Sequence, residues 1–356
     1  MPAALPVIEI DLGSDTGTRP TAAMRQAMAS ADVGDEQAGE DPTVNKLCEM
    51  ACELTGHEAA VYVPSGTMCN AIAYRLYCRQ GDGVILDELA HPIHAEAGGP
   101  AALSGAMMIT VKGDRGIFTG EQVHAAIRPY KHNRVVAKAV SMEQTSNFGG
   151  GAVWPYETMK GVAEAARERG LAVHMDGARL LNAAVASGRP AKEYAQLCDT
   201  TWIDLSKGLG CPVGAVLVGS KDLIHEAWHW KHQFGGSMRQ AGIIAAAGVY
   251  AFQHHIDRLA EDHENARRLA RGLAQIEGIV LDPPEIATNM VFFDASGLGI
   301  TNVEVNKRLL EKGVRIGAGY GPKGLMRAVT HLDVDEVKID RALTAVRAVA
   351  AEVRPN

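Results

Sequence analysis

The chain has 356 residues, of which 47% are hydrophobic and 22% charged, with a formal net charge of −7 and a pI near 6.0. This composition is typical of a globular protein large enough for two domains and excludes a disordered chain. The acidic balance, without a dense Lys/Arg block, argues against a nucleic-acid-binding surface as the main function. We therefore expect small-molecule chemistry.

The terminal sequence, the hydrophobic stretches and the cysteines all favour the cytoplasm as the compartment of this protein. The N-terminus has no basic region followed by an apolar core, and no later stretch reaches about 18 uninterrupted apolar residues, so we expect a soluble, cytoplasmic protein without a membrane partner. The six cysteines are scattered, which favours reduced thiols over a disulfide framework. Cys48 and Cys52 lie four apart on an expected helix, but no further ligand completes a metal site.

The predicted elements alternate over the first two thirds of the chain. A short helix over residues 21–30 comes first, followed by a polar, glycine-bearing loop over 34–42 that we expect at a site or a subunit edge, and by a helix over 44–55. Strands are then expected over residues 59–64, 83–87, 106–111, 135–142, 171–175, 201–205 and 215–218, separated by helical segments. Such alternation predicts βαβ units and a mostly parallel sheet.

The last third of the chain has a different pattern. Two long helical segments over residues 238–255 and 256–275 precede a strand over 290–294, a helix over 303–312 and a final helix over 335–353. We therefore expect a large α/β domain over residues 1–250, which includes an extended N-terminal segment, and a small α+β domain over residues 251–356.

A lone cation follows the expected strand over 201–205. Lys207 lies in the run Ser206 to Gly210, where small residues would let a flat cofactor approach the backbone. A desolvated lysine amine at the edge of a buried sheet can attack an aldehyde, as pyridoxal phosphate enzymes require. The alternative is a surface lysine in a glycine-rich turn, and Lys207 alone leaves the two interpretations even.

An acid ends the preceding strand. Asp176 follows the apolar run 171–175, at the carboxyl end of a strand, where open α/β sheets place their ligands. A pyridine ring that acts as an electron sink is protonated, and an Asp against the ring nitrogen is the recurring arrangement. Asp176 alone would be interpreted as a helix cap. With Lys207 at the next strand end, the cofactor role is favoured, because one cofactor could touch both.

Two further segments complete a candidate pocket. The run Ser65-Gly66-Thr67 follows a strand and opens a helix, where free N–H groups and the helix dipole favour a phosphate; an ordinary Ser cap is the alternative. His91 follows the strand over 83–87 and could stack on a pyridine face, although a loop histidine is the simpler interpretation. The pair His254-His255 is interpreted as part of a solvated helix face.

Taken in order, these motifs resemble the L-threonine aldolase family of fold-type-I pyridoxal phosphate enzymes over nearly the whole chain. The resemblance implies a fold-type-I large domain with a mostly parallel sheet and a smaller α+β C-terminal domain. The motifs that carry it are Asp11-Leu12-Gly13-Ser14-Asp15-Thr16, Gly39-Glu40-Asp41-Pro42, Ser65-Gly66-Thr67-Met68, His91 with Glu96, Asp176-Gly177-Ala178-Arg179, Leu205-Ser206-Lys207-Gly208-Leu209, Gly235-Gly236-Ser237-Met238-Arg239-Gln240 and Thr330-His331-Leu332-Asp333-Val334.

The resemblance also implies roles for individual residues. Pyridoxal 5′-phosphate would be bound covalently by Lys207, with Asp176 at the ring nitrogen and His91 stacked on the ring. The other implied contacts are Ser65, Gly66 and Thr67 with the phosphate, Ser14 and Arg327 with the substrate carboxylate, Arg179 at the cofactor and that carboxylate, and Arg239 with a neighbouring subunit's phosphate. The implied protein is a cytoplasmic homotetramer with shared active sites that cleaves L-threonine, allo-threonine and related β-hydroxy amino acids to glycine and an aldehyde.

Three positions depart from the family's usual pattern. Ser146 stands where a histidine usually lies near the substrate's β-hydroxyl, and a serine is a poor general base near neutral pH. Either His94, another group or a water takes the proton, or the natural substrate differs from threonine. Ala38 replaces the usual tyrosine, and His232 the usual interface lysine, with Lys231 beside it. The loss of the usual histidine at Ser146 and of the usual tyrosine at Ala38 predicts a roomier pocket that tolerates phenylserine.

Two other interpretations stay open. The same cofactor could support β-elimination or transaldol transfer, and a lyase of that kind would release a keto acid and ammonia instead of glycine and an aldehyde. A third possibility is a non-catalytic binding or regulatory protein that retains the fold, although Lys207 and Asp176 argue against it.

Overall fold

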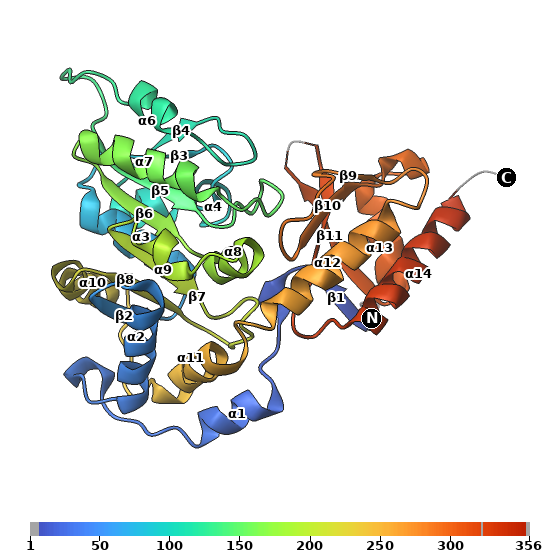
Figure 1. The fold of residues 1–356 in the computed structure, drawn as a ribbon, viewed down its shortest axis with the longest axis horizontal. Helices are drawn as coiled ribbons and strands as arrows, with labels where there is room; N and C mark the ends of the chain where they lie inside the picture. The colour runs from blue at the N-terminus through green and yellow to red at the C-terminus, as the bar shows by residue number, and fades with distance from the viewer. Residues whose placement is uncertain (1–6, 322, 354–356) are drawn as a thin grey trace, which may run out of the picture. The chain divides into compact units, whose positions relative to one another are not determined.

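The computed structural model describes residues 7–321 and 323–353 and divides the chain into two compact units (Figure 1). The larger unit spans Pro20–Asp257, and the smaller unit combines the residues up to Arg19 with those from Arg258 onward. The sequence-based boundary at 250 lies close to this division, but the N-terminal segment joins the smaller unit. The reason is strand β1 (Ile10–Leu12), which pairs in parallel with strand β11 (Val314–Tyr320).

A seven-stranded sheet in the order β2-β8-β7-β6-β5-β3-β4 forms the centre of the larger unit. Within this sheet the strand pairs β3–β4, β3–β5, β5–β6 and β6–β7 are parallel, and the pairs β2–β8 and β7–β8 are antiparallel. This confirms the α/β class with a mostly parallel sheet. The strands are β2 (Ala59–Val63), β3 (Gly83–Asp87), β4 (Met107–Val111), β5 (Ala137–Glu143), β6 (Ala172–Asp176), β7 (Thr200–Asp204) and β8 (Ala215–Gly219).

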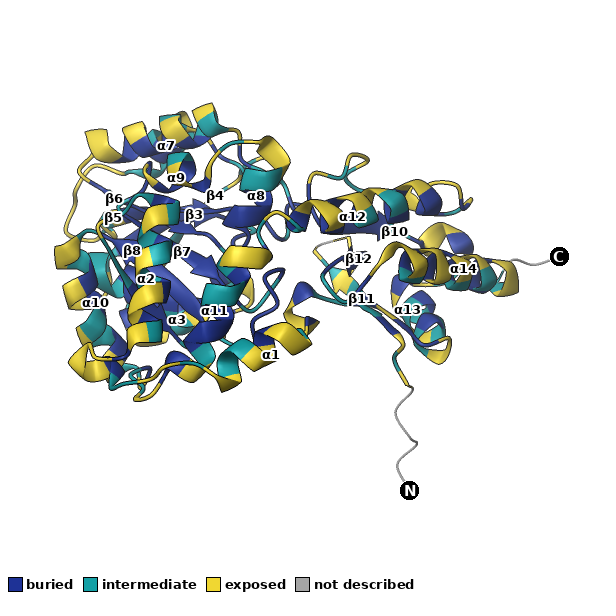
Figure 2. Cartoon of the chain, turned by 60° about the horizontal axis from the view of Figure 1, so that its bottom comes forward, coloured by how far each residue is buried: buried dark blue, intermediate teal, exposed yellow. Residues whose placement is uncertain are grey.

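Helices surround this sheet, and their exposed faces point outward while the strands between them are buried (Figure 2). Helix α3 packs against β2 and β5 to β8, whereas α6 and α7 pack against strands β4 to β6. Strands covered by helices on both faces are buried along their whole length, as β3, β7 and β8 are. The helices are α1 (Ala22–Ala29), α2 (Pro42–Thr55), α3 (Gly66–Tyr77), α4 (His91–His94), α5 (Gly99–Ser104), α6 (Gly120–Ala126), α7 (Tyr156–Glu168), α8 (Leu180–Ser187), α9 (Ala191–Ala195), α10 (Lys221–Gln233) and α11 (Gly242–His254), with a 3-10 turn η2 (Glu36–Ala38).

The polar loop over residues 34–42 is organised by one carboxylate. Oδ1 of Asp41 accepts the backbone N–H groups of Thr43 and Val44, which caps α2 directly before Pro42 at the first helical position. Oδ2 accepts the N–H groups of Gly34 and Gly242. A Cβ at Gly242 would lie 2.5 Å from this carboxylate. The glycine-rich acidic motif therefore joins α2 to the start of α11.

The smaller unit contains a five-stranded sheet in the order β1-β11-β12-β10-β9, covered by apolar helix faces. Its expected strand over 290–294 and the three expected helices are present. The remaining elements are η1 (Asp15–Gly17), α12 (Leu259–Leu273), β9 (Val280–Leu281), β10 (Met290–Asp294), η3 (Ser296–Leu298), α13 (Asn302–Glu311), β12 (Leu325–Val329) and α14 (Glu336–Val353). The motif that begins at Thr330 anchors this unit, because His331 Nε2 lies 2.9 Å from the carbonyl of Asp11.

Two smaller findings complete the fold. His255 was expected on a solvated face, but it is buried, and its Nδ1 lies 2.7 Å from the carbonyl of Leu209 because the end of α11 packs beside the turn after β7. Within residues 7–321 and 323–353, none of the helices combines the length and the apolar character that crossing a membrane requires.

Candidate active site

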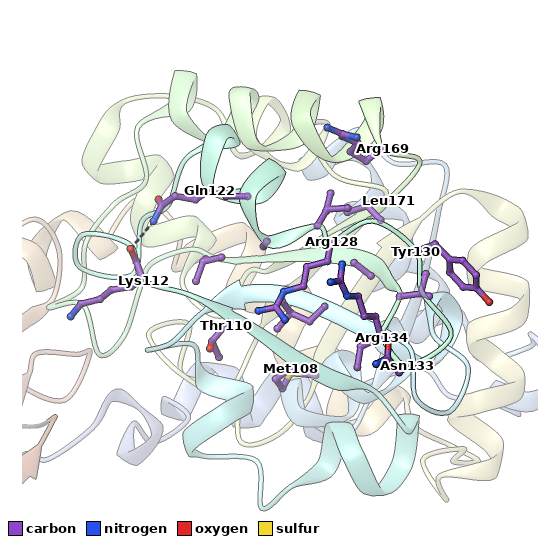
Figure 3. A pocket seen from close by; sticks show the side chains of 18 residues that line it. Met108, Thr110, Lys112, Gln122, Arg128, Tyr130, Asn133, Arg134, Arg169 and Leu171 are labelled. Atoms are coloured by element: carbon purple, nitrogen blue, oxygen red, sulfur yellow. Dashed lines mark hydrogen bonds between the residues drawn. The ribbon is translucent and has the colours of Figure 1, made fainter.

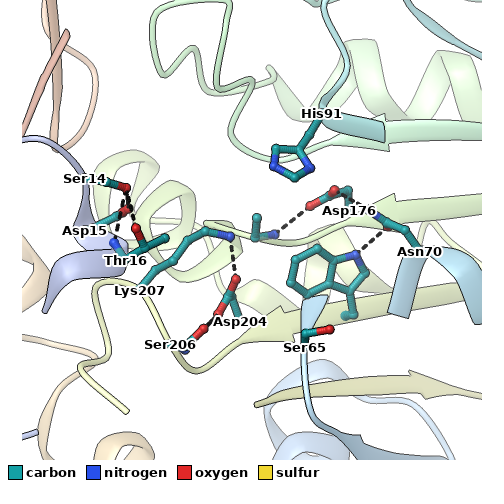
Figure 4. Close-up of polar contacts among 12 residues, drawn as sticks. Ser14, Asp15, Thr16, Ser65, Asn70, His91, Asp176, Asp204, Ser206 and Lys207 are labelled. Atoms are coloured by element: carbon teal, nitrogen blue, oxygen red, sulfur yellow. Dashed lines mark hydrogen bonds and ion pairs between the residues drawn. The ribbon is translucent and has the colours of Figure 1, made fainter. Parts of the chain in front are cut away.

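The carboxyl ends of two adjacent parallel strands bring Asp176 and Lys207 to one edge of the larger unit's sheet (Figure 4). Asp176 is the last residue of β6, and Lys207 follows the last residue of β7 by three positions. Parallel strands place their carboxyl ends together, and this edge is where open α/β sheets bind ligands. The arrangement is the one expected from the two strand ends.

Asp176 is only 1% exposed and is held by two donors. Its Oδ1 accepts the N–H of Ala178 at 3.0 Å, and its Oδ2 accepts an N–H of the Asn70 amide at 2.9 Å. Both carboxylate oxygens are thereby held in place, and Asp176 can serve as a hydrogen-bond acceptor for a donor that enters the site.

The amine of Lys207 has a carboxylate partner that the sequence did not suggest. Nζ lies 2.5 Å from Oδ2 of Asp204, the last residue of β7, and 5.5 Å from the centre of the Trp202 ring. The other oxygen of Asp204 accepts both the N–H and the hydroxyl of Ser206. The signal that could have identified Asp204 is an acid three residues before the lysine, directly at a strand end.

His91 is paired with Glu96. His91 Nδ1 lies 2.9 Å from Oε1 of Glu96, which is 5% exposed. Burial of the His91 ring lowers its pKa, but the hydrogen bond to Glu96 and the nearby carboxylates of Asp176 and Glu143 outweigh this and raise the pKa above the ordinary value. Burial raises the pKa of Glu96.

A single amide bridges these groups. Asn70 donates to Oε1 of Glu96 at 2.7 Å as well as to Asp176. One potential ligand atom each from His91, Glu96 and Asp176 lies within 4.8 Å of the others. The cluster could therefore surround a small positive centre, either a metal ion or a protonated ring nitrogen.

A buried carboxylate from β5 connects two loops of the site. Oε2 of Glu143 accepts the backbone N–H of His91 at 2.7 Å, and Oε1 accepts the N–H of Asn147 at 2.9 Å. Burial first, and the charge of Asp176 second, raise the pKa of Glu143 to about 7. Glu143 thus fixes the loop after β3 to the loop after β5.

The two residues expected near the substrate's β-hydroxyl differ in their surroundings. Ser146 is buried, and a Cβ at Gly116 would lie 2.0 Å from its hydroxyl, which therefore packs against the glycine backbone. His94 is exposed at the end of α4, with Nε2 2.7 Å from the carbonyl of Glu88 and its ring edge-on to Phe148 at 5.5 Å. A carbonyl only accepts, so Nε2 of His94 is a donor, and in the neutral ring Nδ1 is then the nitrogen with the lone pair.

The run Ser65-Gly66-Thr67 opens α3 as expected. The hydroxyl of Ser65 accepts the N–H of Met68 at 3.3 Å, and both Ser65 and Thr67 are exposed. A Cβ at Gly66 would lie 2.3 Å from the Trp202 ring, so only glycine fits this position without movement of the indole. The exposed start of a helix of twelve residues is a suitable anion site.

The loop before α11 presents Arg239 on the surface. Arg239 forms an ion pair with Asp35 at 2.8 Å, and its side chain is 63% exposed. His232 is exposed and hydrogen-bonds to Ser237. Lys231 is fully buried and forms an ion pair with Glu36. Lys231 is therefore a link between α10 and η2 and not a surface cation that could substitute for His232.

The residues expected at the substrate carboxylate belong to both units. Arg179 is buried at the start of α8 in the larger unit. In the smaller unit, Arg327 is buried on β12 and donates to the carbonyl of Gly13 at 3.3 Å, next to Ser14. The hydroxyl of Ser14 caps η1 (Figure 4).

The larger unit also has an open hollow of about 870 Å³ elsewhere, between β4, α6 and the segment 127–136 (Figure 3). Its lining shares no residue with the predicted site. Four basic side chains and no acidic side chain line it, and the basic ones are Lys112, Arg128, Arg134 and Arg169.

Comparisons with known proteins identify the family. The beta-eliminating lyase family model matches residues 11–296. The low specificity L-threonine aldolase of Escherichia coli K12 is 41% identical over 349 residues, which cover 96% of this chain and 99% of that protein. The low-specificity L-threonine aldolase 1 of Arabidopsis thaliana is 39% identical over 327 residues, 90% of this chain and 91% of that protein.

A solved structure agrees at the level of the fold. The threonine aldolase of Leishmania major matches with a TM-score of 0.82 and 21% identity, and the match covers 96% of this chain and 99% of that one. The serine palmitoyltransferase of Sphingomonas wittichii matches with a TM-score of 0.75 at 18% identity, over 97% of this chain and 88% of that one. This chain therefore belongs to the beta-eliminating lyase family and, within it, to the family of low-specificity L-threonine aldolases.

Proposed function

We propose that this protein is a pyridoxal 5′-phosphate-dependent carbon–carbon lyase that cleaves L-β-hydroxy-α-amino acids, threonine and allo-threonine among them, to glycine and an aldehyde. The observation that carries the proposal is the placement of Lys207 and Asp176 at the carboxyl ends of adjacent parallel strands. The relatives with 39% to 41% identity over nearly the full length are named low-specificity L-threonine aldolases, which supports the same reaction here.

The residues present suit this cofactor. Asp176 is a buried carboxylate acceptor, which a protonated ring nitrogen requires. Oε2 of Glu96 is buried and has no hydrogen-bond partner among the described residues, as expected of an atom that a bound group completes. The exposed N-terminus of α3, with Ser65 and Thr67, suits a phosphate.

Each residue then has a physical task. When bound, pyridoxal phosphate supplies an aldehyde carbon that reacts with amines and a ring that accepts negative charge from the substrate's Cα. Lys207 would hold the aldehyde carbon, Asp176 would keep the ring nitrogen protonated, and His91 would stack on the ring. For the substrate carboxylate we assign Arg179 in the larger unit and Arg327 with Ser14 in the smaller unit, because guanidinium groups pair with carboxylates in a planar, bidentate geometry.

His94 is our candidate for the group that accepts the β-hydroxyl proton. Because Nε2 donates to the carbonyl of Glu88, the neutral ring has its lone pair on Nδ1. The hydroxyl of Ser146 packs against Gly116 and is itself a poor base. The exposed imidazole of His94 is therefore a better acceptor for the β-hydroxyl proton than the buried hydroxyl of Ser146.

We also propose a cytoplasmic homotetramer in which Arg239 reaches the phosphate of a neighbouring subunit. The exposure of Arg239 supports this assembly, since its guanidinium lies on the surface beside Asp35. The six cysteines are all free thiols, which supports a reducing compartment.

A glycine-release assay over threonine, allo-threonine, phenylserine and serine tests the reaction. Wild type releases glycine and one equivalent of aldehyde, and phenylserine is cleaved at least as efficiently as threonine. Lys207→Ala abolishes both products, whereas Lys221→Ala, which changes an exposed lysine at the start of α10, keeps them. A keto acid with ammonia would favour the β-eliminating alternative, and a strong threonine preference would contradict the roomier pocket. Full activity in Lys207→Ala would overturn the proposed function.

A second assay tests the proton acceptor. His94→Ala lowers kcat by about a hundredfold or more while KM stays within about threefold, because a general base acts in the transition state. His225→Ala removes an exposed imidazole from α10 and is the matched control. Equal kcat values for the two variants would exclude His94.

A further inference from the structure

The amide of Asn70 uses all of its hydrogen-bonding positions beside the site. Asn70 lies on α3, is 0% exposed, and has four partners on its amide. Oδ1 lies 2.8 Å from Nε1 of Trp202 and 3.1 Å from Nε2 of His174, and Nδ2 lies 2.7 Å from Glu96 and 2.9 Å from Asp176. This is the full capacity of an amide, which donates two hydrogens and accepts two.

The partners determine which way the amide points. An indole N–H only donates, so the Asn70 atom beside Trp202 is the oxygen, and both hydrogens of Nδ2 face the carboxylates of Glu96 and Asp176. His174 agrees with this orientation. Burial lowers its pKa to about 3, so the ring is neutral, and its Nε2 must carry the hydrogen that the Asn70 oxygen accepts.

The donors form a directed chain toward the site. The hydroxyl of Tyr77 donates to Thr200 at 2.9 Å, and the Thr200 hydroxyl lies 2.8 Å from Nδ1 of His174, which has no hydrogen of its own and accepts. His174 donates in turn to Asn70. Each bond polarises the next, so the amide hydrogens of Asn70 are directed at the carboxylates with added strength.

Two carboxylates on one amide are a demanding arrangement, because their charges repel in a buried place. Asp176 has one further donor, the N–H of Ala178, and Glu96 has one, the imidazole of His91. Asn70 is the partner that the two acids share, and Figure 4 shows it beside Asp176. Its loss would affect both acids at once.

We propose, on the basis of the function proposed above, that Asn70 is a positioning residue whose amide, fixed by Trp202 and His174, holds Asp176 as the acceptor for the cofactor's ring nitrogen and Glu96 as the acceptor for His91. Asn70 does not touch the reacting atoms. It acts through the two carboxylates, and its effect is expected first in cofactor affinity.

The test is a titration of pyridoxal phosphate into wild type, Asn70→Asp and Thr200→Val, followed by the absorbance of the bound cofactor. Asn70→Asp keeps an oxygen toward Trp202 and His174 but replaces the donor nitrogen by an acceptor. We expect its Kd to rise by at least about tenfold at alkaline pH, since a charged acceptor loses its donor. The Kd of this variant falls again toward acidic pH, because protonation of the introduced carboxyl restores one hydrogen; wild type lacks this recovery.

Thr200→Val is the matched control. It removes the hydrogen bond between Thr200 and His174 and leaves both donor hydrogens of Asn70 in place. Its Kd should stay within about threefold of wild type. A double-mutant cycle with Asp176→Ala separates positioning from folding: the effect of Asn70→Ala on Kd should shrink when Asp176 is absent, whereas a merely structural effect would persist. Asn70→Ala carries the cycle even where Asn70→Asp does not fold.

The outcomes distinguish the two proposals. Wild type that binds no pyridoxal phosphate overturns the proposed function, and the role of Asn70 with it. Wild-type binding together with an unchanged Kd in Asn70→Asp and Asn70→Ala, or an effect of Asn70→Ala that persists without Asp176, overturns the role of Asn70 alone.

Discussion

The two ends of the candidate site are built differently. At the Asp176 end, Asp176, Asn70 and His174 are at most 1% exposed and are held by partners from α3, β6 and β7. At the other end, Ser65 and Thr67 are exposed at the start of α3, and Lys207 contacts a carboxylate only three residues away. The fold fixes one end before any ligand binds and leaves the other end open for the ligand to complete.

Among the residues that would hold the ligand without a covalent bond, the largest expected effect comes from the fixed end. Asp176→Asn keeps the shape of the side chain but removes the charge that a protonated ring nitrogen needs, so kcat/KM for glycine release should fall by at least about a hundredfold. Asp222→Asn changes an exposed acid in the first turn of α10 and is the control. A loss below about tenfold would show that the buried end is not the electrostatic centre of the site.

The pH dependence of folding stability tests the buried end of the site through Glu143, because its carboxyl is buried beside Asp176. Its folded pKa of about 7 lies above the ordinary value of 4.5, so the folded protein binds the extra proton between these values. The contribution of Glu143 to the stability of wild type should therefore fall by about 3 kcal/mol as pH rises across that window. The stabilising contribution is complete below the lower value and gone above the higher one.

The measurement compares wild type with Glu143→Gln, which cannot titrate. Urea unfolding at about pH 4.5 and about pH 8 should show the variant gaining stability relative to wild type as pH rises, by about 3 kcal/mol. A difference between the two proteins that is the same at both pH values would contradict the raised pKa.

The smallest effect is expected at the open end. Ser65→Ala removes one hydroxyl from a site where backbone N–H groups also donate, so the Kd for pyridoxal phosphate should rise by only roughly fivefold. Isothermal titration of the cofactor measures this change, with Ser220→Ala, another helix cap, as the control. A rise in this Kd of about a hundredfold, which matches the loss of kcat/KM expected for Asp176→Asn, would mean that the open end is as tightly organised as the buried one.

The parts of the site that the sequence predicts are those set by strand ends. Asp176 and Lys207 each follow an apolar run, and the parallel pairing of β6 and β7 brings such positions together without knowledge of any side-chain contact. The position of Ser65 could also be predicted from the sequence, because a serine directly before a helical segment lies at the start of the helix, as a cap or as part of an anion site.

The supporting residues could not be predicted in the same way. Asn70 lies within an apolar helical run, and its partners Glu96 and Asp176 come from elements whose packing around α3 leaves no local pattern. The same holds for Glu143, which reaches the backbone of His91 across the sheet edge. The N-terminal strand was misplaced in the domain division for this reason as well, since its partner β11 lies near the other end of the chain.

This pairing of β1 with β11 has a consequence for synthesis of the chain. Ile10 to Leu12 leave the ribosome long before their partners Val314 to Ile316 are made. The larger unit is continuous from Pro20 to Asp257 and can fold as soon as that stretch has emerged. Strand β1 must wait until β11 has been made, so completion of the smaller unit is a late step of folding that depends on closure of a very long loop.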